Sequence, residues 1–338
     1  MGLRGYIVKR LIYTVFLVLF VLTINFVIFE VMPGSPIDFF IGNARQILTP
    51  EKIAAIMHRW GLDQPWHVRY LTYLTSMLTW NFGETSPATG NVPVGPYIMQ
   101  YLPNTLILMG LSTVLSILIG VILGVIAAYK RGGLFDSASV ITSLITFSLP
   151  TFWMGLVFIS IFQGILPAGR IVGDNMPPWN LNFLLGTQIS YPSLVELQSR
   201  IQHLILPTAV LTLFQYGNYL LLTRATMLET LTEDYILTAR AKGLKERTII
   251  FKHALKNASL PIITSSALAF GFLISGAMIT ENVFSYPGIG WLTLNSIMLT
   301  QDYPVLHVIF YVTALTVIIA NFISDMLYGV IDPRIKYG

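Results

Sequence analysis

Residues Asn104–Ala128 read NTLILMGLSTVLSILIGVILGVIAA, a run of 25 residues without a charged side chain. A helix that rises 1.5 Å per residue needs about 20 apolar residues to cross a hydrocarbon core about 30 Å thick. The run is therefore long enough to span a bilayer. It stops at the basic turn Lys130–Gly133, and basic residues beside a span favour its cytoplasmic end.

The rest of the chain has the composition of an integral membrane protein. Of its 338 residues 54% are hydrophobic and 11% are charged, and the mean hydropathy is +0.69. That balance leaves too little polar surface for a soluble globule. Five further apolar segments can cross a membrane: Leu11–Val31, Ala138–Gln163, Leu204–Leu222, Leu260–Thr280 and Pro304–Ser324. The sequence therefore predicts an all-α polytopic protein with six transmembrane helices.

Three of these segments carry local signals. Leu11–Val31 follows a basic start and lacks a small-x-small cleavage site, which predicts a retained signal anchor. Pro150 lies near the middle of the third segment and predicts a kink, because proline removes a backbone hydrogen bond. The fourth segment holds Pro207, Gln215 and Asn218, so one side of it is expected to face protein or water.

The distribution of lysine and arginine predicts that both termini are cytoplasmic. With the N-terminus inside, cytoplasmic segments hold 14 of the 20 basic residues. The chain then divides into a stub with the first helix at 1–31, an extracellular segment at 32–103, a five-helix core at 104–329 and a cytoplasmic tail at 330–338. The core includes a cytoplasmic loop at 223–259. The placement of the basic residues, more than the net charge of +4, thus carries the information on orientation, and we expect no nucleic-acid partner.

Motifs for catalysis and metal binding are absent from the sequence. There are no cysteines, the five histidines show no ligand spacing, and neither GxxxxGK[ST] nor GxSxG occurs. Four acids at membrane depth fall near helix ends, where interfacial solvation or local pairing is expected: Glu30, Asp136, Glu281 and Asp325. The midplane is left without a proton relay. We expect no enzymatic activity, no metal and no cofactor in this chain.

The extracellular segment is predicted to hold two short helices. One begins after Thr49-Pro50-Glu51 and ends near Gly61, and the second follows Pro65. Ile53, Ile56, Met57 and Trp60 give the first helix an apolar face. A structural cap on the membrane helices is one role for this segment, and a docking surface for an extracellular partner is the other. A second external loop, Leu166–Arg200, is rich in proline and is predicted to be irregular.

Small residues within the spans predict close helix contacts. Gly120 and Gly124 form a GxxxG pair, and Gly271, Ser275 and Gly276 gather in the fifth segment. Packing between helices is the first interpretation of both groups. A small-residue wall around a solute path is the alternative.

The cytoplasmic loop between the fourth and fifth segments is the most informative stretch. Residues 233–261 are polar and basic, are helix-prone up to Gly243, and resume a helical pattern after Leu244. This predicts a short helix, a glycine turn and a second helix at the cytoplasmic face. Binding of anionic lipid headgroups is an alternative role for so basic a segment.

The stretch Tyr235–Pro261 resembles the EAA loop of ABC importer permeases, in the form found in the dipeptide and oligopeptide B-subunit family. Further matches follow in order along nearly the whole chain: Arg10-Leu11, Met32–Pro36, Gly61–Pro65, Leu102–Leu106, Glu281–Gly290, Asp302–Pro304 and Asp332–Arg334. In this alignment Thr238 and Ala239 take the alanine positions and Gly243 takes the glycine position. Leu237 stands where other importers have glutamate, and His253–Lys256 stands where they end in proline; both departures look typical of the peptide branch.

The resemblance implies the type I importer permease fold, in which the EAA loop forms a coupling helix seated on an ATPase. It implies four partners besides the lipid bilayer: a second homologous permease in a heterodimer, two cytoplasmic ATPase subunits and an extracellular solute-binding protein. ATP and magnesium would be bound by the ATPases. The residues expected to couple this chain to the ATPase are Thr238, Ala239, Arg240, Ala241, Lys242, Gly243 and Leu244.

The implied function is import of di- or oligopeptides through the cell membrane by alternating access, in which ATPase closure moves the coupling helices. Importers of oligosaccharides or nickel complexes look similar to this family, and the residues that line the path are not identifiable in the sequence. A membrane scaffold or receptor is an alternative from another class. It need not retain an ATPase pair, whereas a permease should.

Overall fold

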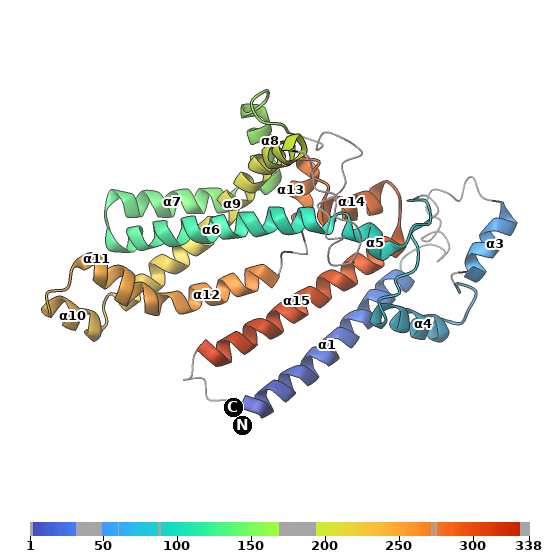
Figure 1. Cartoon of the computed structure of the whole chain (residues 1–338), viewed down its shortest axis with the longest axis horizontal. Coiled ribbons are helices and arrows are strands. Elements are labelled where there is room, and N and C mark those ends of the chain that lie inside the picture. Colours follow the sequence, from blue (N-terminus) through green and yellow to red (C-terminus); the bar gives the residue numbers. More distant parts are fainter. Residues whose placement is uncertain are drawn as a thin grey trace.

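The computed structural model describes residues 3–31, 49–59, 61–86, 89–168, 194–271, 273 and 276–331. Within these ranges the regular structure is helical, apart from one isolated bridge between Glu84 and Pro93. Two groups of long helices run along the molecule (Figure 1): α6 (Leu102–Tyr129), α7 (Leu134–Ser148) and α9 (Leu194–Thr230) in one, α1 (Leu3–Val31) and α15 (Tyr303–Ile331) in the other. The predicted all-α class is confirmed for this part of the chain.

The closest approach between long helices joins α6 to α9 through two glycines. A Cβ on Gly120 would come within 2.6 Å of the carbonyl oxygen of Tyr216, and one on Gly124 within 2.7 Å of that of Leu220. Only glycine lets the two backbones lie so near. The helix contact predicted from the GxxxG pair is confirmed, and its partner is α9.

Four described helices are long and apolar enough to cross a membrane: Ile7–Phe29, Val94–Tyr129, Leu197–Thr230 and Tyr303–Ile323. They correspond to the first, second, fourth and sixth predicted segments, and the first and sixth end two and one residues before the predicted ends. The fourth is much longer than predicted, because α9 extends over 37 residues. Helix α9 begins at Leu194, so the last residues of the loop predicted at Leu166–Arg200 are helical, and 169–193 of that loop lie outside the described residues.

The third predicted segment is broken at Pro150. Helices α7 and α8 (Thr151–Ile161) meet at 101°. Leu149, with ψ 131°, is extended, because the proline ring disfavours the helical conformation for the residue before it. The predicted site of the kink is confirmed, but the bend is a break between two helices.

At the other end of α7, Asp136 pairs with Arg224 through contacts of 2.5 and 2.8 Å, which confirms local pairing for that acid.

The fifth predicted segment, Leu260–Thr280, is not one continuous helix. Helix α12 (Leu255–Gly271) has 17 residues, and helical structure resumes at α13 (Met278–Val283). Gly276 lies between them with φ +71°, so it does not belong to a helical small-residue face, and Ser275 lies outside the described residues. The chain crosses the membrane six times only if α12 and the bent α7–α8 pair each form one crossing in addition to the four long helices.

Glu281, on α13, is fully buried. Its carboxylate accepts hydrogen bonds from Thr105 Oγ1 at 3.0 Å, from the Trp291 backbone N–H at 2.9 Å and from the Ala277 backbone N–H at 3.3 Å. Thr105 Oγ1 in turn accepts from the N–H of Ile289, the first residue of α14 (Ile289–Met298), at 2.7 Å. These bonds join the start of α6 to α13 and α14.

Interfacial solvation is therefore the wrong interpretation for Glu281, because protein donors supply the hydrogen bonds that water would have made. A Cβ on Gly288 would lie 2.5 Å from Glu281 Oε2, so the glycine makes room for the carboxylate. The side chains of Glu30 and Asp325 lie outside the described part of the chain.

The segment predicted to be extracellular holds α3 (Pro50–Arg59), α4 (Trp66–Leu78) and α5 (Val94–Met99). The two helices predicted there are α3 and α4, and Gly61 follows α3 with φ +63°. Met77, Val94 and Ile98 share one buried cluster with Leu22 of α1 and Val305 of α15, which supports the cap interpretation. Trp60 and the tail at 332–338 lie outside the described residues.

Replacing Gly124 by valine should destabilise the protein by about 1–3 kcal/mol, because the new side chain meets the α9 backbone and the helices must separate. Gly110, on the same helix, has nothing within 4 Å of the place where a Cβ would lie, so Gly110→Ala is the matched control and should keep or raise stability. The thermal unfolding midpoint of the purified protein in detergent checks both. Equal midpoints for Gly124→Val and the parent chain would contradict the packing described here.

Candidate functional site

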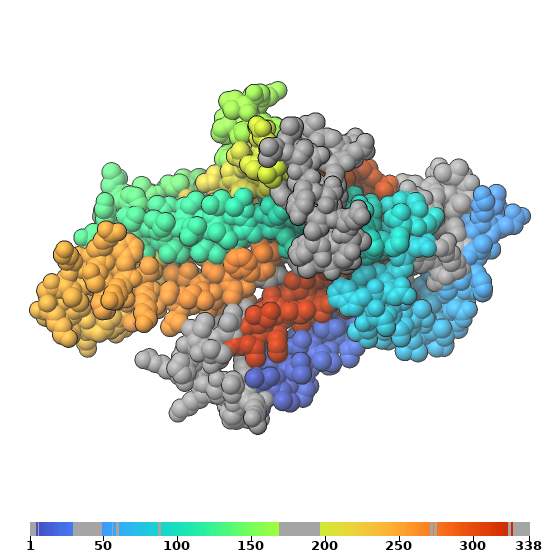
Figure 2. Space-filling model, viewed as in Figure 1, coloured from blue at the N-terminus to red at the C-terminus, as the bar shows by residue number. Residues whose placement is uncertain are grey.

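The loop predicted to be cytoplasmic folds as three consecutive helical pieces: α10 (Asp234–Ala241), α11 (Glu246–Thr248) and the π-helix η4 (Ile249–Ala254), which leads into α12. Glu233 at the N-cap is extended, Asp234 lies in the first turn of α10 and Arg240 in its last turn. This charge order complements the helix dipole. The segment lies beyond the ends of α6 and α9, where Figures 1 and 2 show it projecting at one end of the molecule.

The glycine turn after α10 is a Schellman motif. Gly243 has φ +72°, its N–H bonds to the carbonyl of Arg240 at 2.9 Å, and the N–H of Leu244 bonds to that of Ala239 at 3.3 Å. Both bonds satisfy carbonyls that the helix end would leave open. Nothing lies within 4 Å of a Cβ position at Gly243, so the turn requires glycine for its backbone conformation and not for space.

Two side chains seat α10 on the membrane helices. Ile236 is 0% exposed and Ala239 is 7% exposed, and their i, i+3 spacing places them on one helix face. They belong to a buried cluster formed with the ends of α6 and α9 and the start of the next helices: Val125, Ala128, Met227, Ile249, Ile250, Ala254 and Ala258. A displacement of α10 therefore acts on α6 and α9 through direct packing.

The opposite face of this segment is open. Of the seven residues predicted to couple to an ATPase, Ala239 is buried, and the other six are exposed: Thr238, Arg240, Ala241, Lys242, Gly243 and Leu244. Leu237 is 56% exposed and Phe251 is 54% exposed. Both side chains are apolar, so their exposure to water costs free energy. The segment thus presents apolar side chains next to basic ones, which suits contact with another protein.

Two polar contacts hold the open face in shape. Arg240 Nη2 donates to Glu246 Oε1 at 2.7 Å, and this bond raises the pKa of the Arg240 guanidinium above its ordinary value. Asn257 Nδ2 donates to the Tyr235 hydroxyl at 2.7 Å. The first contact ties α10 to α11 across the glycine turn, and the second ties α10 to α12.

The sequence interpretation missed the residues that seat and stiffen the segment. Ile236 is the deepest side chain of α10, and its spacing from Ala239 was a readable signal for a buried face. The Arg240–Glu246 pair spans six residues and a turn, so helical spacing rules do not reveal it. The π-helix could not be read from residue types, because π turns lack a composition signal.

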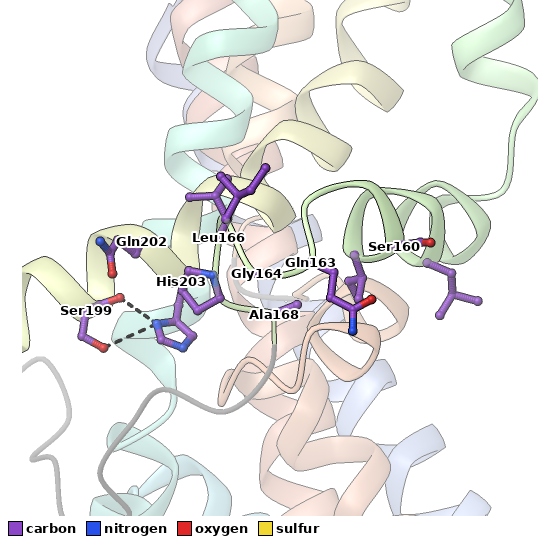
Figure 3. Close-up of a pocket in the computed structure, with 12 residues that line it drawn as sticks. Ser160, Gln163, Gly164, Leu166, Ala168, Ser199, Gln202 and His203 are labelled. Atoms are coloured by element: carbon purple, nitrogen blue, oxygen red, sulfur yellow. Dashed lines mark hydrogen bonds between the residues drawn. The ribbon is translucent and has the colours of Figure 1, made fainter.

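A cavity of about 750 Å³ lies near the other end of α9, between α8, the turn after it and the first residues of α9. It has the size of a small-molecule site. Figure 3 shows the cavity with His203 and Gln202 on α9 and Gln163 beyond the end of α8, and His203 Nδ1 lies 2.7 Å from the Ser199 carbonyl oxygen. None of its lining residues was singled out from the sequence. Within the described ranges no cluster of three or more His, Asp or Glu could hold a metal ion.

Comparison with known proteins gives matches over the whole length. Residues 120–337 match the family described as binding-protein-dependent transport system inner membrane component, and residues 3–109 match the N-terminal part of such components. The oligopeptide transport system permease protein AppB of Bacillus subtilis is 35% identical over 338 residues, covering 99% of this chain and all of that protein. The di/tripeptide transport system permease protein DppB of Pseudomonas aeruginosa is 36% identical, covering 93% of each chain. The dipeptide permease DppB of Escherichia coli K12 is 33% identical, covering 98% of each.

Replacing Ile236 by alanine should release α10 from the membrane helices, since removing a buried isoleucine side chain costs about 2–5 kcal/mol. Leu237→Ala, one residue further on the exposed face, is the matched control and should cost less than about 0.5 kcal/mol. Hydrogen exchange of the amides in 234–241 measures the opening. Unchanged protection in Ile236→Ala would show that this side chain does not hold the helix.

Proposed function

The chain belongs to the family of inner membrane components of binding-protein-dependent transport systems, and we propose that it is the transmembrane permease subunit of an ATP-driven importer of di- and oligopeptides. The observation that carries this proposal is the seated helix α10, which has a buried face on α6 and α9 and an open face on its other side. The relatives reported above are named for peptides. Their names favour peptides over oligosaccharides or nickel complexes.

The proposed assembly has a second homologous permease, two cytoplasmic ATPase subunits and an extracellular solute-binding protein. The number of subunits is a proposal, supported by the family and by the open surface at Thr238 and at 240–244. ATP and magnesium would be bound by the ATPases, so this chain would have no catalytic residue. Both termini are proposed to be cytoplasmic, in line with the placement of lysine and arginine.

The mechanism we propose is mechanical coupling. Closure of the ATPases displaces α10, and the displacement passes through Ile236 and Ala239 into the cluster that joins α6 and α9. Because packed interiors transmit strain and do not compress, the two long helices must move with it. Their motion exchanges an outward-facing cavity for an inward-facing one.

Gly243 tests this coupling. A β-branched residue at φ +72° is strained by roughly 1–2 kcal/mol or more, so Gly243→Val should distort the turn and lower peptide uptake about tenfold per ATP hydrolysed. Gly243→Asn is the matched control, because asparagine tolerates the left-handed conformation, and it should transport nearly as well as the parent. Uptake and ATP hydrolysis are measured together in vesicles that contain the whole complex.

Retention of the ATPases through purification separates a permease from a scaffold. Parental uptake by Gly243→Val would argue against a force-bearing turn. A chain that retains no ATPase would argue against the permease assignment itself.

A further inference from the structure

Helix α4 packs sideways on α1 through one aromatic face. Thr23 Oγ1 and the Tyr70 hydroxyl are 2.7 Å apart, and Asn25 Nδ2 donates to the Tyr73 hydroxyl at 2.8 Å. The Phe26 ring contacts both tyrosine rings, with centroids 5.2 and 5.6 Å apart. These contacts fix where along α1 the short helix lies.

That position is within the apolar span of α1. The span runs to Phe29, and Thr23 precedes Phe29 by six residues, or about 9 Å along the helix axis. Phe26 precedes it by three residues, or about 4.5 Å. Although α4 belongs to the extracellular segment, its contact points therefore lie at the depth of the bilayer and not above it.

The outward side of α4 divides into two flanks. Leu71 and Leu78 lie on one flank and are 60% and 50% exposed, while Leu74 beside them is partly buried against the cluster that contains Met77. Three threonines follow helical spacing on the other: Thr72, Thr75 and Thr79. The helix contains no acidic residue. An amphipathic helix of this kind is suited to a boundary between lipid and water.

Two tryptophans mark the ends of this helix. Trp66, its first residue, is 66% exposed, and Trp80, just after its end, is 53% exposed. Exposed tryptophan is typical of the headgroup level, where the ring sits between apolar and polar surroundings. Apolar side chains of α1 at the same level of the helix are exposed as well, namely Ile24, Val27 and Ile28.

We propose that α4 is an interfacial helix, lying in the headgroup region of the leaflet at the C-terminal end of α1 with its leucine flank in the lipid and its threonine flank toward water. With the orientation proposed above, this is the outer leaflet. The helix braces the end of α1, because lipid on one side and α1 on the other fix its depth. Figure 1 shows α4 beside that end of α1, at the far end of the molecule from α10.

The sequence has no cysteine, so a single introduced cysteine is the only thiol of this chain that a spin label can modify, and the same labelling of the parent complex measures the signal from the other subunits. Leu71→Cys and Leu78→Cys report the leucine flank, and Thr72→Cys, on the same helix, is the matched control. The full chain, with the subunits that purify with it, is placed in phosphatidylethanolamine and phosphatidylglycerol vesicles. Power saturation then compares collisions with oxygen and with a water-soluble nickel chelate. Each variant must first show the thermal unfolding midpoint of the parent chain.

The two leucine positions should lie about 5–10 Å below the headgroup boundary, with oxygen favoured, while Thr72→Cys should favour the nickel chelate. Equal access of the nickel chelate to all three positions would place the whole outward side in water and overturn the proposal. Exclusion of both probes from the leucine positions would mean that protein covers them, and would overturn it as well. Neither result would bear on the coupling role of α10.

Discussion

The close contact of α6 with α9 at Gly120 and Gly124 supports the rest of the structure. Apolar side chains gain nothing by leaving lipid for each other, so helices in a membrane associate through tight packing. Here the absence of two β-carbons permits it. One buried cluster, around Met227, joins these helices at the end that carries α10, and another, around Leu108 and Leu206, joins them toward the start of α6. The packed pair of helices α6 and α9 thereby connects these two clusters.

Hydropathy and helix signals were enough to predict most of the architecture. The spans within α1, α6 and α15, the site of the break at Pro150 and the turn at Gly243 all follow from local properties of the chain. What the sequence did not reveal depends on distant residues. Glu281 can be buried because protein donors replace water at its carboxylate. One of these donors, Thr105, is 176 residues away, and no local sequence pattern predicts such a partner. The end of α12 and the length of α9 are likewise set by packing against other helices.

The sequence predicted the candidate site as one segment with a glycine turn, but it did not separate the two faces of α10. The motif alignment assigned roles to consecutive residues, whereas a helix alternates its faces every few residues. Ala239 consequently faces α6 and α9, while Leu237, at the position without the usual glutamate, faces outward. The open face of α10 therefore depends on apolar and basic side chains, and its shape depends on the bond between Arg240 and Glu246.

The π turn at Ile249–Ala254 leads directly into α12. A π turn holds more residues than an α turn, and each residue advances an α-helix by about 100°. The turn therefore takes in one residue more than an α turn, while α12 keeps the sides that it presents to α9 and α15. A chain one residue shorter here could close the same turn as an α turn, so a change of one residue in length would be absorbed before α12 begins.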